Sequence, residues 1–246
     1  MISLLRVIGH RGAAGHAPEN TLAGLKAAAG LGARCVEFDV KLTYDGELVL
    51  VHDDTVDRTT DGTGRVADLS LDEIRRLDAG LRFAPEFRGE RIPTLAEAVN
   101  LAAELGLAVN IEIKPSSGQE AETGEGLGRA LARDWPAGRH PPLVTSFRPA
   151  ALERLRAVAP WLPRGLLIWE RPPDWLPTAR RLGCRALNAS HQHLDRDLVM
   201  AAKAAGLLVG AYTVNDAARA AEIAAWGVDA VITDVPDRIL ATLGGR

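Results

Sequence analysis

The feature that most constrains this fold is a regular alternation of short apolar runs with amphipathic stretches along the chain. Segments between the runs place apolar residues three and four positions apart, which predicts helices. Repeated strand–helix units form a parallel sheet, and eight of them close into a barrel. Eight runs have the length of a strand, at residues 4–10, 35–40, 107–114, 142–147, 164–170, 185–190, 207–214 and 229–234. We therefore predict an α/β fold, a (β/α)8 TIM barrel in which residues 1–246 form one domain.

Five of the intervening stretches have clear helical spacing, at residues 21–31, 94–105, 149–158, 194–205 and 216–226. The second begins with a capping box, in which Thr94 precedes Glu97 by three residues. Asn20 precedes the first stretch and is predicted to be its N-cap. The stretch 116–128 is rich in Gly and Glu, and we predict a mobile loop there at the rim of the barrel.

One apolar run breaks the alternation, because residues 48–53 follow the second strand with no helix between them. The dipeptide Asp45-Gly46 is a strong signal for a two-residue hairpin loop. The run at residues 48–53 is therefore predicted to return antiparallel to the strand at 35–40, with Tyr44 facing Glu47 and Asp39 facing His52. Directly opposed residues share a face of the sheet. The hairpin thus brings a histidine to a carboxylate.

The segment after this hairpin is irregular and rich in Asp, Gly, Thr and Arg. It contains one predicted helix, at residues 71–77, and is too long for a structureless loop within a compact barrel. We predict that residues 54–93 form an inserted cap on the C-terminal face, between the second barrel strand and its helix. Four aspartates in this region are predicted to form turns and caps: Asp53, Asp54, Asp57 and Asp61.

Charged residues interrupt two of the apolar runs in a repeated pattern. Glu37 and Asp39 alternate, so both side chains point to one side of their strand, and Glu112 and Lys114 repeat this spacing on the next barrel strand. At the mouth of a barrel the three carboxylates converge and repel one another unless a cation lies between them. Oxygen ligands of this kind select Mg²⁺ or Ca²⁺. The alternative is a buried salt-bridge cluster in which Arg11 and Lys114 neutralise the acids.

Two histidines are predicted at the same rim. His10 ends the first apolar run and His52 ends the returning strand, so the pair is suited to general acid and base catalysis near neutral pH. Arg11 and Lys114 supply positive charge that does not bind a metal and that suits an anionic substrate, phosphate in particular. Glu19 is predicted to be structural, with a supporting contact to His10 or Arg11 as its functional alternative.

Bulk composition argues against several other classes of protein. The net charge is −3 and no basic patch dominates, so nucleic acid is not expected as a partner. No apolar run reaches the roughly 20 residues of a membrane span, and the first residues lack the pattern of a signal peptide. Cys35 and Cys184 are predicted to be buried free thiols in a reducing compartment. We predict a cytoplasmic protein without stable membrane association, and the oligomeric state is left open.

The order of the motifs resembles one known family. HRG at 10–12, APENT at 17–21, EFDV at 37–40, HD at 52–53 and EIK at 112–114 are followed by SF at 146–147, YTVN at 212–215 and GVDAVITDVP at 227–236. Together they resemble the glycerophosphodiester phosphodiesterase family over nearly the whole chain. That family has a (β/α)8 barrel with an insertion after the second strand. Two mild departures are Tyr212, where many members have Trp, and Ala230, where Gly is common.

The resemblance implies roles for seven residues: Glu37, Asp39 and Glu112 as ligands of one divalent cation, His10 and His52 as the acid–base pair, and Arg11 and Lys114 as phosphate-binding residues. Two further residues at strand ends, Phe147 and Tyr212, are predicted to contact the substrate. Trp169 is predicted equally to line the mouth of the barrel or to fill it. His191 and His193 are predicted to lie in a surface loop.

The implied activity is metal-dependent hydrolysis of a small glycerophosphodiester to sn-glycerol 3-phosphate and an alcohol such as choline or ethanolamine. We expect a cyclic phosphate intermediate with His10 as base and His52 as acid, although the sequence alone does not separate this route from direct attack by water. Alternatives in the same barrel are a lysophospholipase D-like or phosphatidylinositol phospholipase C-like activity. Alternatives of other classes are a non-catalytic glycerophosphate-binding barrel and a metal-dependent aldolase or isomerase.

Overall fold

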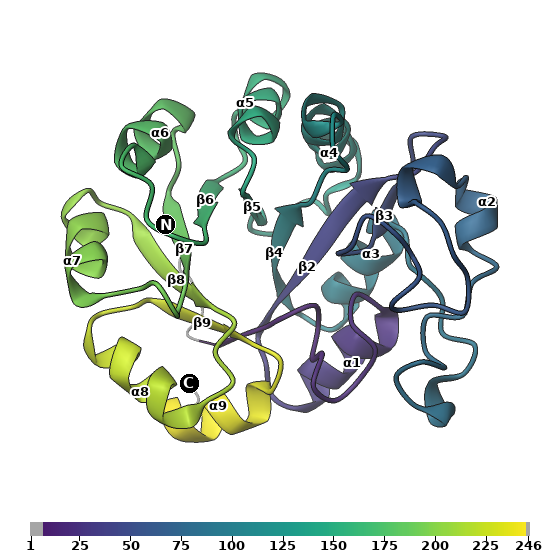
Figure 1. Ribbon diagram of the computed structural model, residues 1–246, viewed down its shortest axis with the longest axis horizontal. Helices are drawn as coiled ribbons and strands as arrows, with labels where there is room; N and C mark the ends of the chain where they lie inside the picture. Colours follow the sequence, from purple (N-terminus) through teal and green to yellow (C-terminus); the bar gives the residue numbers. More distant parts are fainter. Residues whose placement is uncertain (1–6, 245–246) are drawn as a thin grey trace.

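The computed structural model describes residues 7–244, and these form a closed parallel barrel with helices around it (Figure 1). Strand order around the barrel is β1-β9-β8-β7-β6-β5-β4-β2, and pairing of β1 with β2 closes it. The barrel strands are β1 (Val7–Gly9), β2 (Cys35–Leu42), β4 (Ala108–Ile113), β5 (Leu143–Ser146), β6 (Arg164–Ile168), β7 (Ala186–Ser190), β8 (Leu208–Tyr212) and β9 (Ala230–Thr233). The predicted (β/α)8 barrel is confirmed; residues 4–6 of the first predicted run lie outside the described residues.

Eight helices among the described residues surround the strands, and each follows a strand at the carboxyl end (Figure 1). They are α1 (Leu22–Gly30), α3 (Leu95–Glu104), α4 (Glu120–Asp134), α5 (Pro149–Val158), α6 (Trp175–Leu182), α7 (Arg196–Ala204), α8 (Ala217–Ala225) and α9 (Pro236–Leu243). The predicted capping box of α3 is present, because Thr94 accepts from the Glu97 amide and Glu97 accepts from the Thr94 amide. All five predicted helices are found.

Strand β2 shows how the sequence places polar groups inside the barrel. Val36, Phe38 and Val40 are fully buried beneath the surrounding helices and belong to the main apolar core. Burial of a side chain as large as Phe38 stabilises the fold by about 1.5–3 kcal/mol. Because strand side chains alternate, Glu37 and Asp39 then face the barrel interior. The apolar face of the strand therefore fixes where its carboxylates point.

The hairpin between β2 and β3 (Leu48–Leu50) differs by one residue from its predicted register. Lys41 pairs with Val49, and the Thr43 amide donates to the Glu47 carbonyl, so the loop has three residues, 44–46. Gly46 takes the left-handed conformation, with φ of 81°, that closes such a loop. The predicted opposition of Asp39 and His52 is therefore wrong. β3 ends at Leu50, and His52 reaches the site from the bend that follows the strand.

The segment from β3 to α3 has a small apolar core of its own, made of Val49, Val51, Val56, Val66, Ile74, Ala79 and Ile92. It contains a 3-10 turn (Val66–Asp68), the short helix α2 (Leu71–Ile74) and a second 3-10 turn (Pro85–Phe87), at the right of Figure 1. The predicted helix 71–77 is thus found but ends at Ile74. The buried Lys41 ammonium joins this segment to the barrel by donating to Asp54 and to the Lys114 carbonyl. That residues 54–93 form an inserted cap stays a prediction.

The prediction of a mobile loop at 116–128 is wrong, because α4 occupies residues from Glu120 onward. Its glycines are a packing surface. A β-carbon at Gly124 would clash with the Ala151 carbonyl of α5, and one at Gly128 would clash with Val158. Because glycine has no side chain, α4 and α5 can approach each other closely. The packing between the two helices outweighs the low helix propensity of glycine.

Two glycines of α4 give opposite predictions for stability. Gly126→Ala is expected to raise the free energy of unfolding by about 0.5–1 kcal/mol, because a β-carbon there would meet only Leu42 at 3.7 Å. Gly124→Ala is expected to lower it by about 1–3 kcal/mol through overpacking against Ala151. Urea unfolding of both variants measures this. Stabilisation by both substitutions would show that α4 and α5 do not pack this closely.

Candidate active site

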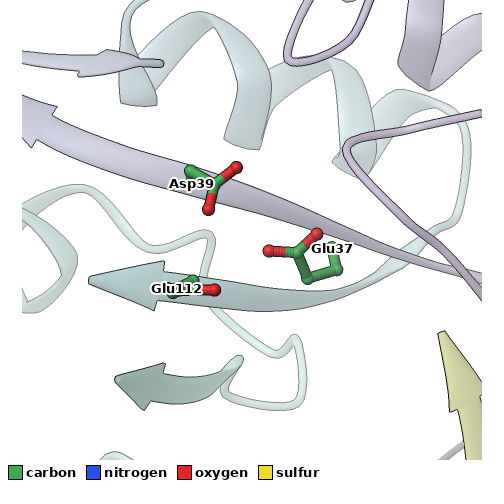
Figure 2. A group of neighbouring side chains, drawn as sticks. All are labelled: Glu37, Asp39 and Glu112. Atoms are coloured by element: carbon green, nitrogen blue, oxygen red, sulfur yellow. The ribbon is translucent and has the colours of Figure 1, made fainter. Parts of the chain in front are cut away.

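Three carboxylates meet inside the mouth of the barrel (Figure 2). Glu37 and Asp39 come from β2, and Glu112 comes from β4, where it is the register partner of Asp39. One oxygen from each lies within 4.8 Å of the others, and the three residues are 4%, 1% and 8% exposed. Burial together with the charges of Asp39 and Glu112 raises the pKa of Glu37 well above its usual range. Burial and the neighbouring Asp39 likewise raise the pKa of Glu112 to about 7.

Two basic side chains neutralise part of this acidic cluster. Arg11 Nε lies 3.3 Å from Asp39 Oδ2, and Lys114 Nζ donates to Glu112 Oε1 at 2.9 Å. Burial would raise the pKa of Asp39, but Arg11 and Lys114 lower it overall. Glu37 accepts the backbone N–H of Arg11 at 3.1 Å, and its pKa nevertheless stays raised. Salt bridges to Arg11 and Lys114 thus do not balance the negative charges of Glu37 and Glu112. The three carboxylates offer only oxygen ligands, which fit a hard divalent cation.

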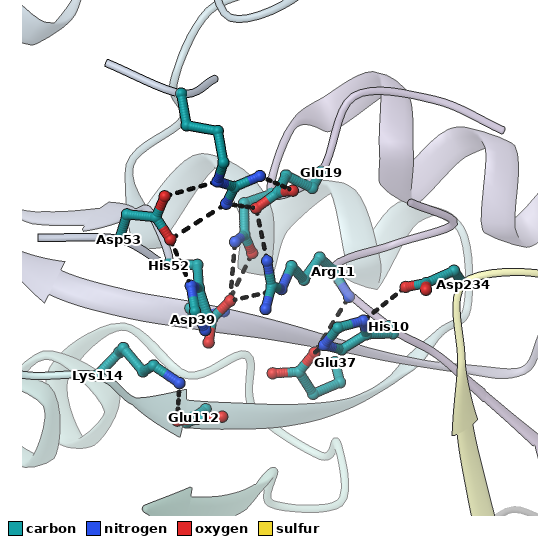
Figure 3. Close-up of polar contacts among 12 residues, drawn as sticks. His10, Arg11, Glu19, Glu37, Asp39, His52, Asp53, Glu112, Lys114 and Asp234 are labelled. Atoms are coloured by element: carbon teal, nitrogen blue, oxygen red, sulfur yellow. Dashed lines mark hydrogen bonds and ion pairs between the residues drawn. The ribbon is translucent and has the colours of Figure 1, made fainter. Parts of the chain in front are cut away.

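His10 is held by an aspartate from the opposite end of the chain (Figure 3). Its Nδ1 lies 2.6 Å from Asp234 Oδ1, and the two residues are 224 positions apart. Asn215 donates to the other Asp234 oxygen at 2.6 Å, and accepts from the Asp234 backbone N–H. Burial would raise the pKa of Asp234, but these contacts lower it. An ionised aspartate at Nδ1 places the exchangeable site of His10 at Nε2, which is 4.0 Å from Glu37.

His52 has an equivalent partner that lies next to it in the sequence. Its Nδ1 is 2.7 Å from Asp53 Oδ1, so Asp53, which lies in a bend of the chain, is also a partner of the histidine. Burial lowers the pKa of His52, and Arg11 and Lys114 contribute to this, although Asp39 opposes it. Hydrogen bonding to Arg58 lowers the pKa of Asp53 strongly. Each histidine therefore has an aspartate that fixes its ring orientation.

Arg11 and Asn20 lie in the loop between β1 and α1, and both contact carboxylates of the neighbouring strand β2. Asn20 donates to Asp39 Oδ2 at 2.9 Å and accepts the Asp39 backbone N–H at 3.1 Å. The N-cap of α1 is Thr21, so the prediction of Asn20 as the cap is wrong. Glu19 accepts from Arg11 Nη1 at 2.7 Å, which is the supporting contact expected as its functional alternative. Burial would lower the pKa of Arg11, but Asp39, Glu19 and Glu37 raise it.

A cavity of about 360 Å³ opens beside these groups. Its lining brings together nine residues that the sequence analysis names, His10, Arg11, His52, Glu112, Lys114, Phe147, Trp169, His191 and Tyr212, with Ser190, Gln192 and Thr213. His191 thus lies in a loop, as predicted, but at the cavity. Lys114 Nζ is 5.1 Å from the centre of the Phe147 ring, and the Tyr212 hydroxyl donates to the Ile168 carbonyl at 2.7 Å. A larger hollow of about 580 Å³ lies between α3 and α4, outside the barrel.

Known proteins share both the sequence pattern and the fold of this chain. The model of the glycerophosphoryl diester phosphodiesterase family matches residues 10–238. The chain belongs to this family. A glycerophosphodiester phosphodiesterase of Caldanaerobacter subterraneus subsp. tengcongensis is 38% identical over 234 residues, which cover 95% of this chain and 96% of that protein. The resemblance drawn from the motifs is confirmed.

Solved structures of other phosphodiesterases have the same fold. The structure of a phosphodiesterase from Oleispira antarctica, in complex with the product sn-glycerol-3-phosphate, has a TM-score of 0.94 and 39% identity, covering 98% of this chain and 97% of that one. The glycerophosphodiester phosphodiesterase of Agrobacterium tumefaciens has a TM-score of 0.78 and 30% identity, covering 97% and 100%. Family members thus share this barrel over nearly the full chain.

Sequence reasoning missed four residues of the site: Asn20, Asp53, Arg58 and Asp234. Asp234 had a usable signal, because it directly follows a barrel strand, where the other site residues also lie. Asp53 directly follows a histidine that was already singled out. Arg58 had no such signal, since it lies in the irregular segment after β3.

Proposed function

We propose that this protein is a metal-dependent phosphodiesterase that hydrolyses glycerophosphodiesters to sn-glycerol 3-phosphate and an alcohol. The observation that carries the proposal is the convergence at one cavity of a carboxylate cluster, two histidines paired with aspartates, and the side chains of Arg11 and Lys114. Membership of the phosphodiesterase family supports the reaction class. The solved relative that holds sn-glycerol-3-phosphate as its product supports the substrate class.

Glu37, Asp39 and Glu112 are proposed to hold one divalent cation, Mg²⁺ or Ca²⁺. Such a cation, when bound, polarises phosphoryl oxygens and lowers the pKa of a nearby hydroxyl. Burial and the neighbouring carboxylates raise the pKa values of Glu37 and Glu112 although Arg11 and Lys114 lie close by, and this supports the assignment because the three carboxylates can accept further positive charge. Asn20 holds Asp39 in place through two hydrogen bonds.

The other residues of the site are proposed to bind the phosphate and to transfer protons. Arg11 and Lys114 are proposed to bind the phosphate, and each is held in position by a carboxylate partner. His10 takes a proton from the glycerol hydroxyl next to the phosphoryl group, and this oxygen attacks phosphorus to give a cyclic phosphate. His52 protonates the departing alcohol. In the second step the two histidines exchange roles while water opens the ring, and the Asp234 and Asp53 contacts keep Nε2 of each ring available throughout.

Phe147 and Tyr212 are proposed to contact the substrate as apolar walls of the cavity. Their rings pack edge to face with centres 5.9 Å apart, so they form a single continuous surface. Trp169 is 52% exposed and packs against His193 at the rim, where it borders the cavity without filling the mouth. In residues 7–244 no helix has the length and apolar character needed to cross a membrane.

The proposal is tested by release of glycerol 3-phosphate from glycerophosphocholine with EDTA, and again after Mg²⁺ or Ca²⁺ is restored. We expect activity to vanish with chelator and to return with one of the ions. Phosphorus NMR of the same reactions checks for the cyclic phosphate. Faster turnover of lysolipid micelles would favour the lysophospholipase D-like alternative. Binding of glycerol 3-phosphate without turnover of any diester would overturn catalysis and favour the binding protein.

A further inference from the structure

The side chain of Arg58 binds two carboxylates, one that holds His52 and one that holds Arg11. Its Nε and Nη2 donate to the two oxygens of Asp53 at 2.6 and 3.2 Å, and its Nη1 and Nη2 donate to the two oxygens of Glu19 at 2.7 and 2.8 Å. Asp53 holds His52 through the contact at 2.7 Å, and Glu19 holds Arg11 at 2.7 Å. The contacts of Asp53 and Glu19 can be followed in Figure 3. One guanidinium therefore connects a histidine and an arginine that belong to different loops.

The backbone around Arg58 is held by contacts that do not involve its side chain. Val56 and Thr60, two residues to either side, are fully buried, and the Thr60 amide and hydroxyl both donate to the Val56 carbonyl. The Gly64 amide donates to Asp57, which closes the turn. Arg58 thus projects from a rigid turn, and less side-chain freedom is lost when it binds two carboxylates.

We propose that Arg58 is a positioning residue, which orients His52 through Asp53 and Arg11 through Glu19. This inference rests on the proposed function for its effect on activity. Of residues 7–244, those that line the cavity do not include Arg58, so its action passes through its partners. Bidentate contacts to both carboxylates fix the orientation of each one, and a carboxylate held at both oxygens cannot rotate away from its histidine or arginine.

A role in stability accounts less well for these contacts. The Arg58 side chain is 50% exposed, and ion pairs at such positions contribute little to folding because solvent screens them. The chain offers a matched comparison in Arg75, which is 48% exposed and bound to Glu97 at 2.8 Å, away from the site. Arg58 and Arg75 are thus equally exposed, but Arg75 binds one carboxylate, which caps α3, whereas Arg58 binds two carboxylates, which hold His52 and Arg11.

The first test compares Arg58→Gln with Arg75→Gln in the full chain. Arg58→Gln is expected to lower kcat by about 10- to 100-fold, as displacement of supporting groups does in other sites, with a melting temperature close to that of Arg75→Gln. Arg58→Lys is expected to stay impaired, because an ammonium group lacks the planar fork that binds two carboxylates. The double variant with Asp53→Asn is expected to lose less activity than the product of the two single losses, since the pathway to His52 is removed only once, but more than Asp53→Asn alone, since the pathway to Arg11 is removed as well.

A second readout does not depend on turnover. Nitrogen NMR of the imidazole rings reports which ring nitrogen of His52 carries the proton, and we expect Nδ1 in the wild type and a mixture of tautomers in Arg58→Gln. His10, held by Asp234, is the internal control and is expected not to change. An inactive wild type would refute the proposed function, while this readout would still decide the role of Arg58.

Three results would overturn the role of Arg58. The first is a single His52 tautomer with unchanged kcat in Arg58→Gln. The second is a fall in melting temperature with tautomer changes at both histidines, which would indicate a structural role. The third is full activity of Arg58→Lys, which would mean that charge without bidentate geometry is sufficient.

Discussion

Glu112→Gln is expected to lower kcat/KM by about 10³-fold or more, which corresponds to the several kcal/mol that a metal centre supplies to such a reaction. The amide removes one negative oxygen from the proposed cation site and leaves the ammonium of Lys114 without its partner at 2.9 Å. Glu122→Gln, on the exposed side of α4, is the matched control and should retain wild-type activity. Kinetics at saturating Mg²⁺ or Ca²⁺ measure both variants.

The same carboxylate gives a pH dependence with a defined sign. Without a cation the pKa of Glu112 is raised from 4.5 to about 7, so the folded state favours the protonated form. The stability that this group contributes is fully present below pH 4.5 and is lost as the pH rises through 7. A cation binds the ionised form, so its stabilising effect on the melting temperature should increase from pH 5.5 to pH 8. This increase should be smaller in Glu112→Gln.

A cation-induced shift in melting temperature that is the same at every pH would contradict the assignment of Glu112 as a ligand. So would activity of Glu112→Gln within a few-fold of the wild type. A further check is the wild type in EDTA, which should show no such increase in stability between pH 5.5 and pH 8.

Substitution of the two histidines is expected to have large and different effects. General acid or base catalysis contributes about 10²- to 10⁴-fold, so His52→Ala should lose about this much activity with glycerophosphocholine. With a p-nitrophenyl ester of glycerol phosphate the loss should be much smaller, because p-nitrophenolate departs without a proton. His10→Ala should lose activity on both substrates, since the attacking hydroxyl must be deprotonated in each case.

Release of p-nitrophenol and of choline measures this difference directly. His16→Ala is the control, because His16 forms its own pair with Asp237 at 2.8 Å and is outside the proposed acid–base pair. If His10→Ala were the variant that recovers with p-nitrophenyl ester, the roles of base and acid would be reversed. Equal losses on both substrates in both variants would exclude His52 and His10 as general acids for the leaving alcohol.

Much of the fold could be predicted because its signals are local. The barrel strands are short, mostly apolar and followed by turns, and in β2 the alternation of apolar and charged residues shows which side chains pack against the helices and which face the barrel interior. Helix α4 was missed for the opposite reason. Its glycines reduce intrinsic helix propensity, and only their contact with α5 explains why they are there. The hairpin register was missed by one residue, because the signal at Asp45-Gly46 does not specify whether the loop has two or three residues.

The sequence by itself determined the barrel and indicated the seven side chains of the proposed site, because burying a charged or titratable group at the end of an apolar strand costs free energy and is therefore unusual outside a functional site. Only the tertiary structure decided how these groups are held. Asp234 reaches His10 because closure of the barrel brings β9 beside β1, across 224 positions of the chain. Arg58 reaches Asp53 and Glu19 because the segment after β3 folds back over the loop after β1. Such contacts depend on chain closure and on loop geometry, so a local pattern can mark Asp234 as a residue at a strand end but cannot show which residue it binds.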